Sequence, residues 1–290
     1  MARNVLAFPN RVDSTRHVAT FSGGSWEADL PLTNLRDPRL AYVARSTDTT
    51  EASTHFDVDL QVERDILVVA IPGGNVSRDG RVRLTAASDA GFASVVAAVD
   101  WADWWPVVYE FGALPWGSPS FWDGKIDAEA AEGYEMPWHF VFSTPVQARY
   151  WRIEISDVGN LDGYVELPRL VLAPGCQPSR NYGHGARMGW ADDSTVERSL
   201  GGAVFVAPQP RYRKFDLTWP YLPRGEALAW VMDMQRQLGV SGQAYYVENP
   251  DDVTNRHRLS MLCRLRQLDP LDFVPALRAS AALALEEVIA

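Results

Sequence analysis

Apolar and polar residues alternate along several stretches of this 290-residue chain. Trp151, Ile153 and Ile155 alternate with charged and polar side chains. A period of two places one set of side chains on a core and the other in water, so the stretch predicts a β-strand. A turn at 157–163 follows, because Asn160 and two glycines tolerate the backbone angles of a reversal. Further strands are predicted at 56–60, 65–71, 81–85 and 107–111.

The last hundred residues predict short strands around one helix. The helix begins near Glu226, whose carboxylate suits the helix dipole, and it ends near Gly239. Its apolar stripe consists of Leu228, Val231 and Leu238, with Met234 at its flank. The strands are predicted at 194–198, 203–207, 213–219, 244–247 and 258–268. For Ser280–Ile289, helix and strand are both open alternatives.

The segment Pro145–Leu172, with its two predicted strands and the turn between them, resembles the last strands of discoidin-like (galactose-binding-like) jelly rolls. Asn34–Pro38 and Val43–Ser46 resemble the opening loop and first strand of the same family. The resemblance covers about residues 28–174 and implies a β-sandwich that binds surfaces or sugars and is usually not a catalyst. The family often ties its ends with a disulfide, and the N-terminal side of this region has no cysteine.

The C-terminal region resembles, in its layout, the core of phage tail-tip proteins of the distal tail type. The residues that carry this resemblance are Phe215–Trp219, Pro223–Leu238 and Tyr245–Pro250, and it covers about residues 187–275. It implies a structural role as a symmetric ring that joins the tail tube to tip or baseplate proteins. The implied partners are further copies of the chain and neighbouring tail proteins. The implied location is the tail of a virion, after synthesis in the host cytoplasm.

Together these patterns predict a mainly β protein, with a discoidin-like jelly roll and a smaller β module that contains one helix. We expect an N-terminal strand segment at 1–27, the sandwich at 28–174 and the smaller module at 187–290. Residues 175–186 are rich in Pro, Gly and polar side chains and are expected to form a linker.

Aromatic residues concentrate between 101 and 122, with glycines and prolines among them, so this segment predicts loops more than one regular helix. A short helical turn is predicted at 128–132. Flat aromatic rings stack on sugars, and exposed ones mark interaction surfaces, although many fill cores. Trp104 and Trp105 are adjacent, so on a strand they would face opposite ways. The candidate binding residues, for an intersubunit contact or a glycan, are Trp101, Trp104, Trp105, Trp116 and Trp122.

The composition of the chain excludes several classes of partner. A net charge of −10 argues against nucleic acid, whose phosphates require a basic surface. No run of about 20 apolar residues predicts a membrane span, and the start lacks the apolar core of a signal peptide. Cys176 and Cys263 are expected to be free thiols. The histidines lack metal-ligand spacing, so no metal or cofactor is expected; they are His17, His55, His139, His184 and His257.

No nucleophile, phosphate-binding or zinc motif is present, so no enzyme activity is expected. The sharpest enzymatic alternative is a glycan hydrolase that uses Glu132 and Glu135 near Asp123, because glycosidases need two carboxylates beside a sugar. A solvated acidic loop is the favoured interpretation. The discoidin resemblance also raises a calcium site at Asn34–Asp37, although few oxygens are available there.

The arginines of the C-terminal region predict solvated strand faces or, in a ring, contacts with Asp251 and Asp252 of a neighbouring copy. They are Arg211, Arg213, Arg256, Arg258, Arg264 and Arg266. The prediction from sequence is therefore a structural tail-tip or baseplate component of a tailed phage. The first alternative is a carbohydrate-binding adhesin or receptor-binding module, with a surface glycan as partner. The second is the hydrolase.

Overall fold

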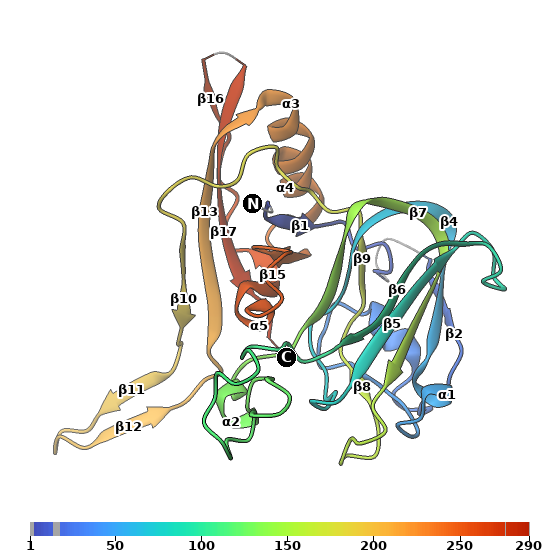
Figure 1. Ribbon diagram of the computed structural model, residues 1–290. Helices are drawn as coiled ribbons and strands as arrows, with labels where there is room; N and C mark the ends of the chain where they lie inside the picture. Colours follow the sequence, from blue (N-terminus) through green and yellow to red (C-terminus); the bar gives the residue numbers. More distant parts are fainter. Residues whose placement is uncertain (1–2, 14–17, 276, 290) are drawn as a thin grey trace. The chain divides into compact units, whose positions relative to one another are not determined.

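The computed structural model describes residues 3–13, 18–275 and 277–289, and its chain divides into two compact units (Figure 1). Unit 1 contains the described residues up to Gln177 together with Tyr245–Met261. Unit 2 contains Pro178–Ala244 and the described residues from Leu262 onward. His17 lies outside the described residues. Strands make up 42% of the structure and helices 11%, so the predicted mainly β class is confirmed.

Unit 1 is built on an antiparallel sheet in which neighbouring strands have the order β2-β4-β7-β5-β6, and β9 pairs with β4. The strands are β2 (Thr20–Ser22), β4 (Phe56–Ile71), β5 (Arg81–Ala87), β6 (Val95–Asp103), β7 (Trp138–Ser156) and β9 (Val171–Ala173). The smaller elements are β1 (Val5–Ala7), η1 (Leu32–Arg36), β3 (Ala44–Arg45), α1 (Glu51–Thr54), α2 (Ala128–Ala131), β8 (Glu166–Leu167) and α5 (Arg256–Leu259).

The predicted alternation sets the core of unit 1. Trp151, Ile153 and Ile155 of β7 are all buried, and Val58 and Phe56 of β4 lie opposite the first two. The residues between them point to the other face, where oppositely charged side chains of adjacent strands form ion pairs. These pairs are Arg152–Asp57, Arg149–Asp59 and Arg83–Glu154. Where β4, β5 and β7 carry these residues, one sheet face is therefore apolar and the other carries a series of ion pairs.

Unit 2 contains a sheet in which β17 lies between β15 and β13, β10 pairs with β13, and β16 pairs with β17. The strands are β10 (Arg187–Ala191), β13 (Tyr212–Pro223), β14 (Gln243–Val247), β15 (Ser260–Leu265), β16 (Asp272–Val274) and β17 (Arg278–Glu287). Part of β14 and of β15 is counted with unit 1. Phe215, Leu217 and Trp219 of β13 are buried, as the alternation predicts.

The hairpin of β11 (Thr195–Arg198) and β12 (Val204–Ala207) also belongs to unit 2. Both strands are exposed along their whole length. In Figure 1 the hairpin extends beyond the ends of β10 and β13. The sequence predicts both strands, and the structure confirms them.

The predicted helix runs without a break through α3 (Arg224–Glu226), the π-helical turn η2 (Ala227–Met232) and α4 (Asp233–Leu238). Gly239 ends it in the left-handed region, with a φ of 55°. Val231, Met234 and Leu238 are buried as predicted, whereas Leu228 is 37% exposed and Ala227 is buried instead. The buried stripe is thus shifted by one residue at the start of the helix.

Three local predictions need correction or completion. No strand forms at 107–111, because Val108 and Tyr109 both donate their amides to the Gly124 carbonyl and only Val107 bridges to Lys125. The strand predicted at 258–268 begins two residues later, because residues 256–259 form α5. The open segment 280–289 is strand β17, whose alternate residues pack on the core. Cys176 and Cys263 are both buried and are not joined in a disulfide.

Candidate functional site

The aromatic loop of unit 1, residues 107–125, is closed by the bridge between Val107 and Lys125. Arg78 fixes its far end, because its Nη2 lies 2.7 Å from Asp123 Oδ2 and its carbonyl accepts a hydrogen bond from Lys125 Nζ at 2.7 Å. Gly124 has a φ of 62°, and a Cβ there would lie 2.4 Å from the Tyr109 carbonyl oxygen. The loop base is therefore rigid, although the segment lacks regular secondary structure.

An aromatic cluster occupies this loop. Its rings are Phe111, Trp116, Phe121 and Trp122, with neighbouring centroids 5.0–6.1 Å apart. Trp116 is 80% exposed and Trp122 is 71% exposed. Tilted and edge-on geometry is favourable for aromatic pairs, so the rings support one another although Trp116 and Trp122 remain largely exposed. Two of the five predicted site residues, Trp116 and Trp122, thus come together on the surface.

The other three predicted tryptophans lie elsewhere. Trp104 is 0% exposed, stacks on Trp138 at a centroid distance of 6.4 Å, and donates its Nε1–H to the Met136 carbonyl. Trp101 on β6 lies under the Arg83 guanidinium, 4.9 Å from ring centroid to Cζ. Trp105 is half-buried and donates its Nε1–H to the Val76 carbonyl. Trp104 is therefore part of the core, while Trp101 and Trp105 keep some accessible surface.

Trp105 forms one wall of a cavity of about 460 Å³ in unit 1, which we call the Arg256 pocket. A cavity of this volume is within the range of small-molecule sites, roughly 300–1,000 Å³. Its lining residues are Val99, Ala102, Asp103, Trp105, Pro106, Val107, Trp138, His139, Phe140, Val141, Pro250, Val253 and Arg256. They come from β6, from the start of β7, from the base of the aromatic loop and from the segment that leads into α5.

Arg256 is the principal cation of this pocket, although only 6% of its surface is exposed. Its Nη2 donates to the carbonyl oxygens of Trp104 and of Asp103, the latter at 3.3 Å. Among the residues that the structure describes, its Nε has no acceptor, and the guanidinium forms no ion pair. Burial lowers the pKa of Arg256 to about 10, so the side chain is still charged at neutral pH.

Two further titratable groups, Asp103 and His139, line the pocket with Arg256. Asp103 lines the same pocket, but its carboxylate lies 3.3 Å from Lys125 Nζ. His139 is neutral at pH 7, because burial and, to a smaller extent, the charge of Arg256 lower its pKa to about 3. Its Nδ1 lies 3.2 Å from the Tyr245 hydroxyl. The charge of Asp103 offsets part of the lowering of the Arg256 pKa, but its carboxylate forms its ion pair with Lys125.

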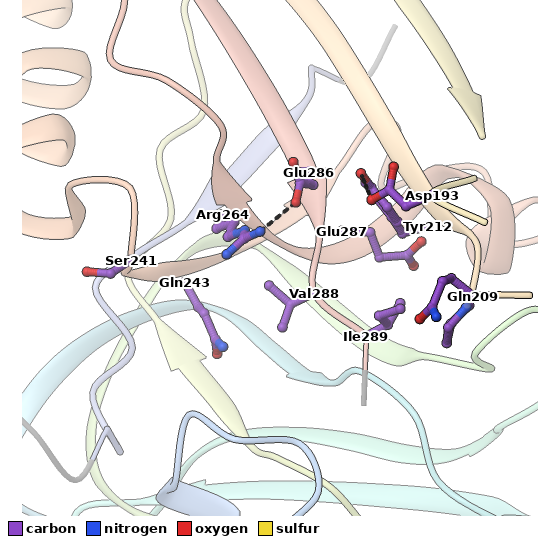
Figure 2. Close-up of a pocket in the computed structure, with 11 residues that line it drawn as sticks. Asp193, Gln209, Tyr212, Ser241, Gln243, Arg264, Glu286, Glu287, Val288 and Ile289 are labelled. Carbon is purple, nitrogen blue, oxygen red and sulfur yellow. Dashed lines mark hydrogen bonds and ion pairs between the residues drawn. The ribbon is translucent and has the colours of Figure 1, made fainter. Parts of the chain in front are cut away.

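Unit 2 contains a second cavity, of about 410 Å³, which we call the Glu287 pocket (Figure 2). Its acidic side chains are all engaged. Glu286 accepts from Arg264 at 2.7 Å, Asp193 accepts from the Tyr212 hydroxyl at 2.9 Å, and Glu287 forms a buried ion pair with Arg213. The remaining lining residues are Gln209, Pro210, Ser241, Gln243, Val288 and Ile289.

The hydrolase alternative finds little support in the geometry. Glu132 and Glu135 are exposed, Asp123 pairs with Arg78, and other residues line both cavities. At the proposed calcium loop, Asn34 donates to the Val43 carbonyl and Asp37 pairs with Arg39. Within the described ranges, no three His, Cys, Asp or Glu side chains gather as a metal site. No helix in the described parts of the chain is long and apolar enough to cross a membrane.

In the sequence, Arg256 looks like the other five arginines of the C-terminal region, for which solvated strand faces are predicted. Four of the six pair inside unit 2, in the ion pairs Arg211–Asp192, Arg213–Glu287, Arg264–Glu286 and Arg266–Asp216. Arg256 differs because the carbonyls it contacts are about 150 residues away in the sequence. The signal that the sequence gave for this pocket was Trp105, which belongs to the aromatic residues of 101–122 and lines the cavity.

No protein-family model and no curated protein matches the chain. Among the solved structures that are similar to it are three carbohydrate-binding domains. A family 32 carbohydrate-binding module of NanJ from C. perfringens, in complex with galactose, shares 15% identity over 58% of this chain and 98% of that one, with a TM-score of 0.37. A mutant of the lectin binding domain of lectinolysin, in complex with Lewis b, shares 15% identity over 58% of this chain and 97% of that one, with a TM-score of 0.38. A Streptococcus pneumoniae fucose binding module shares 12% identity over 57% of this chain and 95% of that one, with a TM-score of 0.36.

Proposed function

We propose that this protein binds carbohydrate without converting it, and that the aromatic loop of unit 1 carries the binding surface. The observation that supports the proposal is the aromatic cluster in which the exposed rings of Phe111, Trp116 and Trp122 pack around the half-buried Phe121. Exposed aromatic surface of this kind is unfavourable in water unless a ligand covers it. The contacts that hold the loop at its base reduce the conformational entropy that is lost when a ligand binds, relative to an unanchored loop.

Sugar is the ligand that this surface suits best. The face of a pyranose ring carries C–H groups that pack on an indole, while its hydroxyls need polar partners at the edge. Asp123 and Arg78 lie at the base of the same loop and can exchange hydrogen bonds with such hydroxyls. An aromatic platform beside a fixed ion pair therefore supplies both kinds of contact.

A glycan array followed by titration of the best glycan tests the proposal. We expect saturable binding that falls at least tenfold in Trp116→Ala and in Trp122→Ala, with no turnover of the glycan. Trp190→Ala is the matched control, because Trp190 is an exposed tryptophan of unit 2. If no glycan binds, or if all three variants behave alike, the aromatic loop is not a sugar site.

A structural role in a larger assembly is the second candidate, and the β11–β12 hairpin favours it. Val196, Val204, Phe205 and Val206 are exposed on its strands, and an isolated two-stranded hairpin is only marginally stable in water. A protein partner that packs on the hairpin would cover these side chains. The place of this assembly in a phage tail rests on the resemblance alone.

Native mass spectrometry over a range of concentrations tests this second candidate. A closed oligomer that dissociates in Phe205→Ser, and persists in the control Phe273→Ser, would support it. Phe273 is a suitable control because it is an exposed phenylalanine on β16 of the same unit. A monomer at every concentration would favour the glycan-binding function without an assembly.

A further inference from the structure

We propose that the Arg256 pocket is a second binding site, which takes the carboxylate-bearing ring of an acidic sugar. The site is distinct from the aromatic cluster, because the cavity is lined by other residues. The two are connected through Val107, which lines the pocket and closes the base of the aromatic loop. The inference extends the proposed glycan binding by naming the class of sugar.

The first argument is charge. A guanidinium that is removed from water without an ion-pair partner carries a large desolvation cost, and native proteins usually pair such a group. Arg256 is 6% exposed, and its Nε has no acceptor among the described residues. Its Nη2 is already committed to backbone carbonyls, which are neutral acceptors. An incoming anion would supply the missing charge.

The second argument is the chemistry of a guanidinium. Its fork of N–H donors matches the two oxygens of a carboxylate, and charge-assisted hydrogen bonds of this type are roughly twice as strong as neutral ones. His139 stays neutral, and Lys125 pairs with the Asp103 carboxylate and so reduces the repulsion between Asp103 and an anionic ligand. Arg256 is thus the group in the pocket that can bind a carboxylate.

The third argument is the wall of the pocket. Trp105, Trp138 and Phe140 contribute aromatic surface, and Val99, Val141 and Val253 contribute aliphatic surface. A bare inorganic anion would leave these walls in contact with water. A ring that carries C–H groups on its faces and a carboxylate at one edge would cover the walls and reach Arg256 together. A sugar acid has this combination.

The test measures binding of D-glucuronate, D-glucose and acetate at millimolar concentration by ligand-observed NMR or calorimetry. We expect glucuronate to bind at least tenfold more tightly than either of the others, because only glucuronate has both the ring and the charge. Equal binding of glucose and glucuronate would overturn the role of Arg256. Equal binding of acetate and glucuronate would overturn the sugar, and no binding of glucuronate would overturn the site.

A matched pair of variants locates the binding. Val253 lines the pocket and is exposed, so Val253→Asp places a carboxylate in the cavity without disturbing the core. We expect Val253→Asp to weaken glucuronate binding at least tenfold and the uncharged Val253→Asn to weaken it less than threefold. Arg256→Gln should abolish binding, and far-UV circular dichroism checks its fold. Equal binding by both Val253 variants would contradict the location.

The same measurements separate this inference from the proposed function. If Trp116→Ala loses array glycans but glucuronate binding is retained, both sites stand. If glucuronate binds in the Arg256 pocket while Trp116→Ala has no effect on any glycan, the aromatic-loop proposal fails and the pocket remains. If Val253→Asp leaves glucuronate binding unchanged while Trp116→Ala loses array glycans, the pocket fails and the aromatic loop remains.

Discussion

The two cavities of this protein have similar volumes and opposite electrostatic designs. In the Glu287 pocket each carboxylate has a partner, and the most buried of them pairs with the equally buried Arg213. In the Arg256 pocket the buried guanidinium has only backbone carbonyls as acceptors among the described residues. Because a buried charge is costly, the first arrangement is complete without a ligand, and the second would be completed by one.

The largest expected effect comes from breaking the complete pair. Arg213→Met leaves Glu287 buried without its counter-ion, so we expect the free energy of unfolding to fall by about 3–5 kcal/mol. Denaturant titration with a spectroscopic readout measures this change in the free energy of unfolding. The double variant Arg213→Met/Glu287→Leu removes both charges and should recover much of the loss. A loss below about 1 kcal/mol in the single variant would mean that the pair is not desolvated.

The free energy of unfolding should depend on pH through His139, which lines the Arg256 pocket. Its pKa is about 3 in the folded chain and near its ordinary value of 6.5 in the unfolded chain. Between these values the unfolded state binds more protons, so the stability is complete above pH 6.5 and falls as the pH drops toward 3. One such group contributes at most about 1.4 kcal/mol per pH unit.

The measurement is the slope of unfolding free energy against pH from 6.5 to 3.5. We expect a shallower slope in His139→Gln than in the unsubstituted protein, because the variant removes the group that takes up the proton. His184→Gln, a change at an exposed position, is the control. Identical slopes in all three proteins would show that the His139 ring is solvated in both states.

Replacing Arg256 should lower the free energy of unfolding by less than replacing Arg213. Arg256→Met deprives two carbonyls of a donor, but it leaves no charge behind and removes a desolvated guanidinium. We therefore expect a net loss of about 1 kcal/mol, well below that of Arg213→Met. Denaturant titration of both variants under one set of conditions makes the comparison. A loss as large as that of Arg213→Met would show that Arg256 is a structural residue.

Local patterns predicted the strands better than the sites. The alternation around Trp151 and around Phe215 depends on neighbouring residues only, and both strands form with the expected faces buried. The tryptophans of 101–122 look alike in the sequence, yet Trp104 is core and Trp122 is surface, because burial depends on contacts such as the stack on Trp138. The burial of Arg256 is likewise a product of the fold, which brings its guanidinium to the carbonyl of Trp104 while the Asp103 carboxylate pairs with Lys125.

The smallest expected effect concerns the rim of the Glu287 pocket. Arg264 pairs with Glu286 at 2.7 Å, but about half of the Arg264 side chain is exposed to solvent. Water and salt screen such a pair, so Arg264→Gln should lower the unfolding free energy by no more than about 0.5 kcal/mol, and by less at high salt. Denaturant titrations at low and high ionic strength measure the effect. If Arg264→Gln costs as much as Arg213→Met, the electrostatics of this pocket depend on its rim rather than on its buried pair, and burial alone would not explain the contrast between the two cavities.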